Sequence, residues 1–377
     1  MRTVPKQEMG ARYRCDIIVA TWNKLDYIKE CVESILKHTD VKSRLIIVDN
    51  ASEEETRAYL RALKGTDTVD IKLIFNNTNL GPGKARNKAL EIIDADYVCF
   101  ADSDIVVTPG WLSTMIAVAE TNSDIGMVNP SSNNFNQVPP GDVSLEAYAR
   151  MLSPFLDSFI EAGHCISFCM LIKAQVVKQI GLIDEEYVLA LYEDTDYSMK
   201  ASSEGYRCVI ARGAYVWHHG HGSTGRVKKI NAIAEKNRER FYKKWGRPVR
   251  IAWFSAARVE SAEFKEAMAS SVKLARDGNF IYIFAAGAIA FSREEIFKRS
   301  NLVEHANVHL KFYPGRGFNW FCLWRILIKR KKRYEMVVAD ENIGALLQKF
   351  RFFYQAKIVT TRDFNKILKV VRELKFR

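Results

Sequence analysis

Short apolar runs alternate with amphipathic stretches along about the first 130 residues, and this alternation constrains the fold more than any other feature of the sequence. The runs are apolar throughout, as strands are when both faces of their sheet are covered. A stretch of helical periodicity follows most of them, which predicts a βαβ series and a mostly parallel sheet. The runs are "CDIIVAT" at 15–21, "RLIIVDN" at 44–50, "IKLIFN" at 71–76 and "DYVCFAD" at 96–102.

A second alternating series begins at residue 250 and continues to the end of the sequence with five strand-then-helix units. The 377 residues exceed what one hydrophobic core usually supports, so we expect two domains. The sequence predicts a Rossmann-like α/β domain at 1–248 and a small, basic, doubly wound α/β domain at 249–377. No glycine-rich phosphate loop follows the strands of the second series, so no motif predicts a ligand there.

Positive charge is concentrated in the last third of the chain. Of the net charge of +12, residues 246–377 contribute 26 Lys and Arg against 12 Asp and Glu, whereas residues 1–245 carry 30 against 32. The run "FIYIFAAGAIAF" at 280–291 is shorter than the roughly 18 residues that span a bilayer. The N-terminal stretch has no apolar signal segment and the seven cysteines lack metal-like spacing, so we expect reduced thiols in a cytoplasmic protein.

Two carboxylates, Asp102 and Asp104, interrupt the apolar run "CFADSDIVVT" at 99–108. They lie at the end of a predicted strand, where ligands bind in parallel sheets. Neighbouring carboxylates repel and cost several kcal/mol to desolvate unless a cation or hydrogen-bond donors compensate. Mg²⁺ or Mn²⁺ would compensate, because these ions bind through carboxylates and substrate phosphates. A helix cap after Pro109, or a solvated turn, is the alternative interpretation.

Six segments in sequence resemble the inverting family 2 glycosyltransferases, which have the fold called GT-A. The resemblance covers about residues 13–245, and the order and spacing of the segments agree with the family. The segments are "IIVATWNKLDYIKECVESIL", "LIIVDNAS", "NNTNLGPGKARNKAL", "DYVCFADSDIVV", "YEDTDYSMKASSEGY" and "VWHHGHGST".

The resemblance implies a binding site for a nucleotide-diphospho-sugar. Thr21, Asn23 and Asp49 would hold its base and ribose. Asp49 could instead cap the following helix. Gly81 and Gly83 would let the backbone approach the nucleotide, and Arg86 would reach ribose or phosphate. An ordinary helix start with Pro82 near its first position would explain the two glycines equally well.

The same resemblance divides the metal site between two carboxylates and a histidine. Asp102, with Ser103 beside it, would contact ribose or metal-bound water, and Asp104 would ligate Mn²⁺ or Mg²⁺ directly. His218 would be a second protein ligand, since a neutral imidazole suits Mn²⁺. His219 and His221 lie so close in sequence that the choice among the three histidines stays open, and a surface or core histidine is the plain alternative.

An acidic group would supply the base that an inverting displacement needs. Glu193 and Asp194 resemble the acidic pair of the family, and Asp194 is the expected base. Asp196 would only stabilise the first turn of the following helix, where negative charge is favourable. All three acids acting in that way is the alternative.

The segment 316–333, with "FNWFCLWRILIKRKKR", combines a large apolar content with a cationic end. Such a helix could lie at an anionic membrane surface, where each Lys or Arg contributes about 1 kcal/mol. A core helix with a solvated cationic end is an equally good interpretation. No motif predicts binding to nucleic acid.

Together these features predict a metal-dependent inverting glycosyltransferase that acts on an acceptor hydroxyl of a glycan, a lipid-linked acceptor or a protein. We expect it in the cytoplasm, with peripheral association at the inner membrane face. Two other functions stay open. One is a nucleotidyltransferase that releases pyrophosphate, and the other is a degenerate transferase that acts without catalysis through its basic domain.

Overall fold

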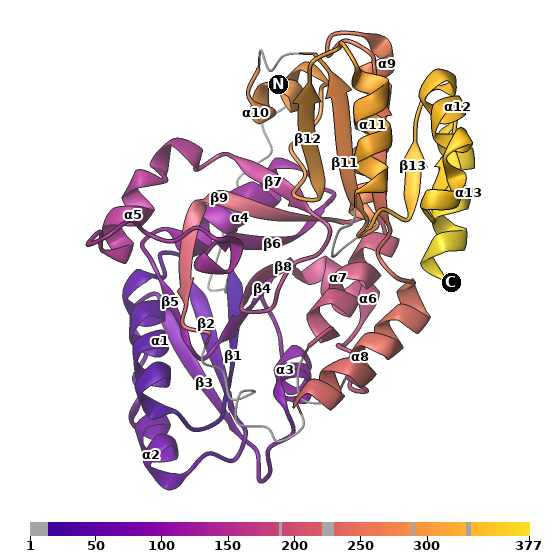
Figure 1. Ribbon diagram of the computed structural model, residues 1–377. Coiled ribbons are helices and arrows are strands. Elements are labelled where there is room, and N and C mark those ends of the chain that lie inside the picture. Colours follow the sequence, from indigo (N-terminus) through magenta and orange to yellow (C-terminus); the bar gives the residue numbers. More distant parts are fainter. Residues whose placement is uncertain (1–13, 188–190, 221–229, 288–290, 329–332) are drawn as a thin grey trace. The chain divides into compact units, whose positions relative to one another are not determined.

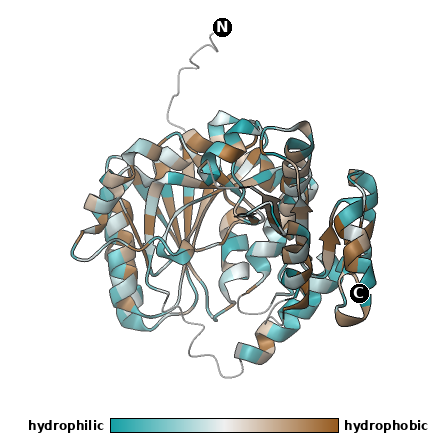
Figure 2. Cartoon of the chain, turned by 45° about the horizontal axis from the view of Figure 1, so that its top comes forward, coloured by the Kyte–Doolittle hydropathy of each residue, from teal (hydrophilic) through white to brown (hydrophobic). Residues whose placement is uncertain are grey.

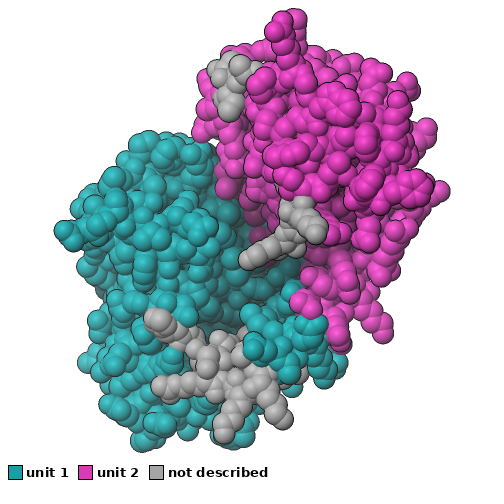
Figure 3. Space-filling view, in the orientation of Figure 1, with its two compact units in different colours: residues 1–159, 165–237 teal, residues 160–164, 238–377 magenta. Residues whose placement is uncertain are grey.

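The computed structural model describes residues 14–187, 191–220, 230–287, 291–328 and 333–377, and it divides into two compact units. Unit 1 comprises residues 1–159 and 165–237, and unit 2 comprises residues 160–164 and 238–377 (Figure 3). The α/β class of both units is confirmed. The domain boundary after residue 248 stays a prediction about independently folding parts.

The sheet of unit 1 contains nine strands and is mostly parallel in its pairing (Figure 1). Eight strands follow the order β3-β2-β1-β4-β8-β6-β9-β5, and the ninth, β7, pairs with β9 beside this path. The strands are β1 (Cys15–Thr21), β2 (Ser43–Asp49), β3 (Val69–Phe75), β4 (Tyr97–Asp102), β5 (Ile105–Val107), β6 (Ile125–Ser131), β7 (Phe159–Ala162), β8 (Cys169–Lys173) and β9 (Arg207–His218).

Helices cover both faces of this sheet, which explains why its central strands are apolar throughout (Figures 1 and 2). Within β1, Ile17 and Val19 pack with the helices of one face, and Ile18 packs with those of the other. The first face carries α1 (Leu25–His38), α2 (Glu54–Ala62) and α4 (Trp111–Thr121). The second face carries α3 (Pro82–Leu90), α6 (Ala174–Ile180) and α7 (Glu193–Ser203).

The register of the parallel strands places their polar carboxyl ends at one edge of the sheet. Thr21 of β1 lies opposite Asp49 of β2, and Ala20 lies opposite Asp102 of β4. The predicted loop at 131–165 contains short elements: η1 (Asn133–Phe135), α5 (Leu145–Met151), η2 (Ser153–Phe155) and β7. The helix α8 (Ile230–Trp245) ends the part of the chain before the second strand series.

Unit 2 is the predicted doubly wound domain, with a parallel sheet of order β12-β11-β10-β13-β14 (Figure 1). The strands are β10 (Arg250–Ser255), β11 (Phe280–Ala286), β12 (Val308–Tyr313), β13 (Met336–Val338) and β14 (Lys357–Val359). The helices α9 (Ala262–Arg276), α10 (Arg293–Arg299) and α13 (Phe364–Lys375) pack on one face. The helices α11 (Phe318–Leu327) and α12 (Glu341–Lys349) pack on the other.

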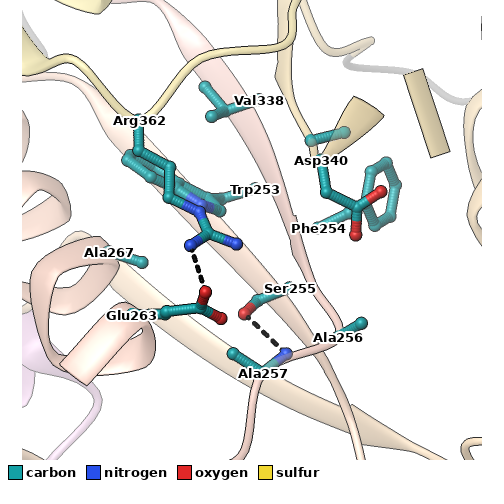
Figure 4. Close-up of a pocket in the computed structure, with 11 residues that line it drawn as sticks. Trp253, Phe254, Ser255, Ala256, Ala257, Glu263, Ala267, Val338, Asp340 and Arg362 are labelled. Atoms are coloured by element: carbon teal, nitrogen blue, oxygen red, sulfur yellow. Dashed lines mark hydrogen bonds and ion pairs between the residues drawn. The ribbon is translucent and has the colours of Figure 1, made fainter. Parts of the chain in front are cut away.

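A cavity of about 210 Å³ opens where the strand order of unit 2 reverses, at the carboxyl ends of β10 and β13 (Figure 4). Its charged side chains already have partners within the unit. Glu263 and Arg362 form an ion pair of 2.6 Å, and Asp340 caps the first turn of α12 by accepting the Ile343 N–H. No helix in the described ranges is both long and apolar enough to cross a membrane.

Candidate active site

Strand pairing brings Asp102, Asp104 and His218 together, although His218 is far from the two acids in sequence. Asp102 is the last residue of β4, and Asp104 lies in the turn that leads into β5. The antiparallel pair of β5 and β9 sets Ile105 opposite His218, which is the last residue of β9. The His219 N–H then donates to the Asp104 carbonyl at 3.0 Å, which holds the turn against the end of β9.

These three side chains offer one nitrogen and two oxygen ligands within 4.8 Å of one another, a group able to hold a metal ion. The His218 Nε2 lies 3.1 Å from Asp104 Oδ1 and 3.8 Å from Asp102 Oδ2. The second oxygen of Asp104 is buried and has no hydrogen-bond partner among the described residues. A buried carboxylate oxygen without a donor is costly, so the donor set and its orphaned oxygen fit Mn²⁺ or Mg²⁺.

The His218 ring is held in place on its other side by the segment after β6. Its Nδ1 lies 2.9 Å from the Asn134 side-chain amide, and the ring stacks on Phe168 with centroids 5.5 Å apart. The Asn133 side chain binds the backbone of His218 at both its N–H and its carbonyl. Contacts of this kind fix which ring nitrogen faces a metal.

Interactions within the group favour a protonated His218 imidazole beside an ionised Asp104 carboxylate. Burial lowers the pKa of His218, but the hydrogen bond that its ring donates to Asp104 and the charge of Asp102 outweigh this effect and raise that pKa above its ordinary value. Burial raises the pKa of Asp104, but His218 outweighs this effect and holds the pKa below its usual range. A divalent cation between these groups would displace the proton from the imidazole, because a metal ligand must be neutral imidazole or ionised carboxylate.

The buried guanidinium of Arg86 contacts two acids of the site. The guanidinium donates to Asp102 Oδ1 at 2.6 Å, lies 3.8 Å from Glu193 Oε1 and stacks over Phe100. Only 2% of Arg86 is exposed, so its positive charge interacts with the neighbouring acids of the protein. Burial nevertheless raises the pKa of Asp102, with Arg86 and His218 opposing the rise. The predicted reach of Arg86 to ribose or phosphate stays a prediction.

The first turn of α7 supplies three acids in three different environments. The half-buried Asp194 accepts the Ser167 N–H at 3.1 Å through one oxygen and the Thr195 N–H at 2.6 Å through the other. Glu193 is buried, and this burial with the nearby Asp194 charge raises the pKa of Glu193 to about 7. Asp196 is fully buried and accepts from the Tyr187 hydroxyl, as expected for a structural acid. Asp194 is close enough to Asp102 to raise the pKa of Asp102.

The three residues predicted to hold the base and ribose lie at the ends of β1 and β2. Asp49 is buried, accepts the Ser52 N–H at 3.2 Å and forms an ion pair with Arg57 at 3.3 Å. The Thr21 hydroxyl lies 3.4 Å from Asp49, so strand pairing joins these two residues. The Asn23 side chain accepts the Glu53 N–H, which places Asn23 at the start of α2. The nucleotide roles of all three stay predictions.

The glycine-containing turn precedes α3. Gly81 is the N-cap residue with φ 82°, a backbone conformation that side chains other than glycine rarely adopt. The Asn50 side chain donates to the Gly81 carbonyl at 3.2 Å, which ties the turn to the end of β2. Gly83 lies within α3, where an added Cβ would meet only Ile183 at an ordinary distance of 3.7 Å. Conformation therefore requires glycine at the first position alone.

Among the described residues, His219 does not join the group of Asp102, Asp104 and His218. The His219 Nε2 pairs with Glu30 at 2.9 Å, and its ring contacts Tyr27. His221 lies outside the described residues. Asn134, Phe168 and Ser167 complete the surroundings of the site, and sequence reasoning missed all three. The only signal was the polar "SSNN" directly after an apolar run, which reads equally well as a loop.

Comparisons with known proteins find a family model and relatives that match part of this chain. Residues 16–181 match the model of the glycosyl transferase family 2. The succinoglycan biosynthesis protein ExoO of Rhizobium meliloti is 27% identical over 228 residues, which cover 57% of this chain and 64% of that protein. The poly(ribitol-phosphate) beta-N-acetylglucosaminyltransferase TarS of Staphylococcus aureus is 29% identical over 126 residues, 33% of this chain and 22% of that protein.

Solved structures with a similar arrangement include a mannosyltransferase, PcManGT of Pyrobaculum calidifontis, in complex with GDP-Man and Mn²⁺. It has a TM-score of 0.46 and 16% identity, and the match covers 62% of this chain and 64% of that one. The TarS 1-349 complex with UDP-GlcNAc has a TM-score of 0.46 and 18% identity, with coverage of 62% and 66%.

The chain spans less than two thirds of the length of the first curated relatives it matches, 64% and 66%. The family match nevertheless falls on the segment that holds β1 to β4 and the Asp102–Asp104 turn. With the mostly parallel sheet described above, it confirms the predicted GT-A class of fold. Residues 16–181 of this chain therefore resemble the glycosyl transferase family 2 over the segment that holds Asp102 and Asp104.

Proposed function

We propose that the chain transfers a sugar from a nucleotide-diphospho-sugar to an acceptor hydroxyl, with inversion at the anomeric carbon and dependence on Mn²⁺ or Mg²⁺. One observation carries this proposal: the Asp102–Asp104–His218 group lies at one edge of the unit 1 sheet, and the Asp194 carboxylate at the start of α7 lies near Asp102. The relatives support the reaction class, since their names describe succinoglycan biosynthesis and N-acetylglucosaminyl transfer.

Asp104 and His218 would hold the cation directly, with Asp102 as the third group. When bound, a divalent cation supplies positive charge that stabilises the departing diphosphate. The chain's own contribution is the fixed position of the donors. Asn134 and Phe168 orient the His218 ring, and Arg86 orients the Asp102 carboxylate. Preorganised donors of this kind need little rearrangement during the reaction.

Asp194 would accept the proton of the acceptor hydroxyl while that oxygen attacks the anomeric carbon. The new bond forms between the acceptor oxygen and the anomeric carbon. The bond from that carbon to the phosphate oxygen breaks, and the nucleoside diphosphate leaves with the electron pair. Two backbone N–H groups fix the Asp194 carboxylate, and its partial exposure leaves it accessible to an acceptor. Glu193 would assist by position, since its own carboxyl is buried against Arg86.

The donor nucleotide would lie along the strand ends between β2 and β4. The contacting residues proposed are Thr21, Asn23, Asp49, Gly81, Arg86, Asp102 and Ser103. The base and the sugar are left open, because the nucleotide sugars in the solved neighbours, GDP-Man and UDP-GlcNAc, belong to those proteins. A carbohydrate acceptor in polysaccharide biosynthesis is the proposed setting, with lipid-linked and protein acceptors as further classes.

We also propose a cytoplasmic location with peripheral association at an anionic membrane through residues 316–333. All seven cysteines are buried free thiols, which supports a reducing compartment.

A product assay tests the reaction class. A panel of nucleotide sugars is first screened with Mn²⁺ for those that raise the melting temperature of the full chain. The selected donor is then incubated with Mn²⁺ and carbohydrate acceptors, and the released nucleotide is identified. We expect a nucleoside diphosphate. Pyrophosphate as the product would instead establish a nucleotidyltransferase, and no turnover or donor hydrolysis with any panel member would favour a degenerate transferase.

A further inference from the structure

The helix α11 of unit 2 is apolar on its outward face as well as on its packed face. Phe318, Cys322 and Leu323 are buried against the sheet. On the other side, Trp320, Trp324 and Leu327 are 64%, 54% and 36% exposed. Their spacing of four and three residues aligns them in one stripe along the helix. A helix that is apolar all round is normally buried completely, so the exposed stripe indicates a surface that something else covers.

A second exposed aromatic pair lies beside the end of this helix. Phe352 and Phe353, in η4 (Arg351–Phe353), are 99% and 74% exposed. Leu327 of α11 and Phe353 of η4 line the same cleft, so the end of the stripe and the aromatic pair border one cleft. We call the five residues Trp320, Trp324, Leu327, Phe352 and Phe353 the α11–η4 surface.

The cleft that joins these elements has a volume of about 700 Å³ and lies where β10, β13 and β14 begin. Four arginines line it, Arg247, Arg325, Arg333 and Arg377, against one acid, Glu335. Across the described ranges, none of the four guanidiniums forms an ion pair with a carboxylate. Glu335 is already engaged, because its Oε2 accepts the Arg250 N–H at 2.6 Å.

One of these arginines has a buried donor without a partner. The Arg325 Nε makes no hydrogen bond within the described structure, although its guanidinium lies over the Phe284 ring. An arginine cluster of this kind suits a phosphate, which offers several acceptor oxygens in a geometry that guanidinium groups match. The cleft wall also includes Ile326, Ile328 and Leu374, so its chemistry is that of an anionic head joined to an apolar body.

We propose that the α11–η4 surface docks on an anionic lipid bilayer, with a lipid phosphate headgroup in the arginine-lined cleft. Tryptophan and phenylalanine side chains are favoured at the bilayer interface, and cationic side chains beside them are attracted to anionic lipid. The net charge of +14 in residues 246–377 has the sign that such a surface requires. The inference rests on the proposed peripheral association but not on glycosyl transfer, so it is tested without a sugar donor.

Vesicle sedimentation of the full chain tests the proposal. Two kinds of vesicle are compared at low salt. One contains phosphatidylcholine alone, and the other also contains about 30% phosphatidylglycerol, which gives its surface a negative charge. We expect binding to the anionic vesicles only. Arg247→Gln with Arg333→Gln should weaken it about thirtyfold, since each cationic side chain near the surface contributes roughly fivefold. Trp320→Ser with Trp324→Ser should weaken it roughly tenfold or more through lost apolar burial.

Matched controls separate this surface from general charge and stickiness. Lys265→Gln with Lys298→Gln removes two exposed cations on the opposite helical layer of unit 2, and Met151→Ser removes an exposed apolar residue of unit 1. Both should bind as the parent does, and melting temperatures check that every variant is folded. Equal binding by the tryptophan variant, or release by equimolar soluble glycerol phosphate, would overturn bilayer docking in favour of a soluble phosphate ligand. Release by RNA at the same charge concentration would overturn it in favour of nucleic acid.

Discussion

Arg86 illustrates how one side chain can be found from sequence while its duty is not. Its place after the glycine-containing turn marked it as a site residue, and the structure does place it at the site. Its partners are two acids of the protein itself, Asp102 at 2.6 Å and Glu193 at 3.8 Å. The sequence could not predict these contacts, because α3, β4 and α7 lie far apart in the chain and no local pattern relates their residues.

The substitution Arg86→Met tests this duty at the level of stability. Removing the buried Arg86 guanidinium leaves the buried Glu193 and the partly buried Asp102 without their compensating charge, so we expect a loss of about 3 kcal/mol in the free energy of unfolding, measured by urea titration. The control Arg61→Met breaks the exposed pair with Glu54 and should cost under about 1 kcal/mol. Equal losses in both variants would show that Arg86 does not neutralise buried acids.

Glu193 should give the stability of the chain a measurable pH dependence. Burial raises its pKa from 4.5 to about 7, so the folded state binds a proton more tightly than the unfolded state does. The contribution of Glu193 to the free energy of unfolding therefore falls as pH rises between about 4.5 and 7, by at most about 1.4 kcal/mol per pH unit. In metal-free buffer, Glu193→Gln should flatten this slope relative to the parent.

The exposed acid Glu55 provides the control for that slope. Glu55→Gln should leave the pH dependence of the parent unchanged, because Glu55 lies in the first turn of α2 and is exposed to solvent. A Glu193→Gln variant with the same slope as the parent would mean that Glu193 titrates as an ordinary surface acid.

At the scale of elements, strands and helices followed from the apolar alternation in both units. The carboxyl-end clustering of polar residues also followed, since parallel strands end at one edge of a sheet. The antiparallel placement of β8 between β4 and β6, and the antiparallel pair of β5 and β9, did not follow, because antiparallel pairing of distant segments leaves no local signature. The pair of β5 and β9 brings His218 to Asp104, so the prediction of the metal group depended on the family resemblance rather than on periodicity.

Gly213 in β9 lies very close to the backbone of Leu156, a contact that the sequence alone does not predict. A Cβ at this position would lie 2.5 Å from the Leu156 Cα and 2.7 Å from its nitrogen, so the backbone next to η2 leaves no room for a side chain. We expect Gly213→Ala to lower the free energy of unfolding by about 1–3 kcal/mol. Gly315→Ala, with nothing within 4 Å of the added Cβ, is the control and should be nearly neutral in thermal denaturation. A neutral Gly213→Ala would refute the close approach.

For the whole molecule, composition identified two units of different character. The near-neutral first 245 residues contain the segment that matches the family 2 model, and the basic remainder forms most of the doubly wound unit 2. Residues 316–333 were predicted to form either a core helix or an interfacial helix, and the interfacial role stays a prediction. The structure packs one face of α11 and exposes two tryptophans on the other, which a count of apolar residues does not distinguish.

The central claim is that two carboxylates at one edge of the unit 1 sheet have different roles: Asp104 holds the metal that binds the donor, and Asp194 removes the proton of the acceptor. Isothermal titration with the nucleotide sugar and Mn²⁺, run beside a turnover assay, tests it on two variants of the full chain. Asp104→Ala should abolish transfer and Mn²⁺-dependent donor binding, because it removes the proposed metal ligand. Asp194→Asn should reduce the rate of transfer by about a hundredfold or more, while the affinity for the donor stays as in the parent. Unchanged turnover in either variant, or lost donor binding in Asp194→Asn, would contradict the roles assigned to these carboxylates.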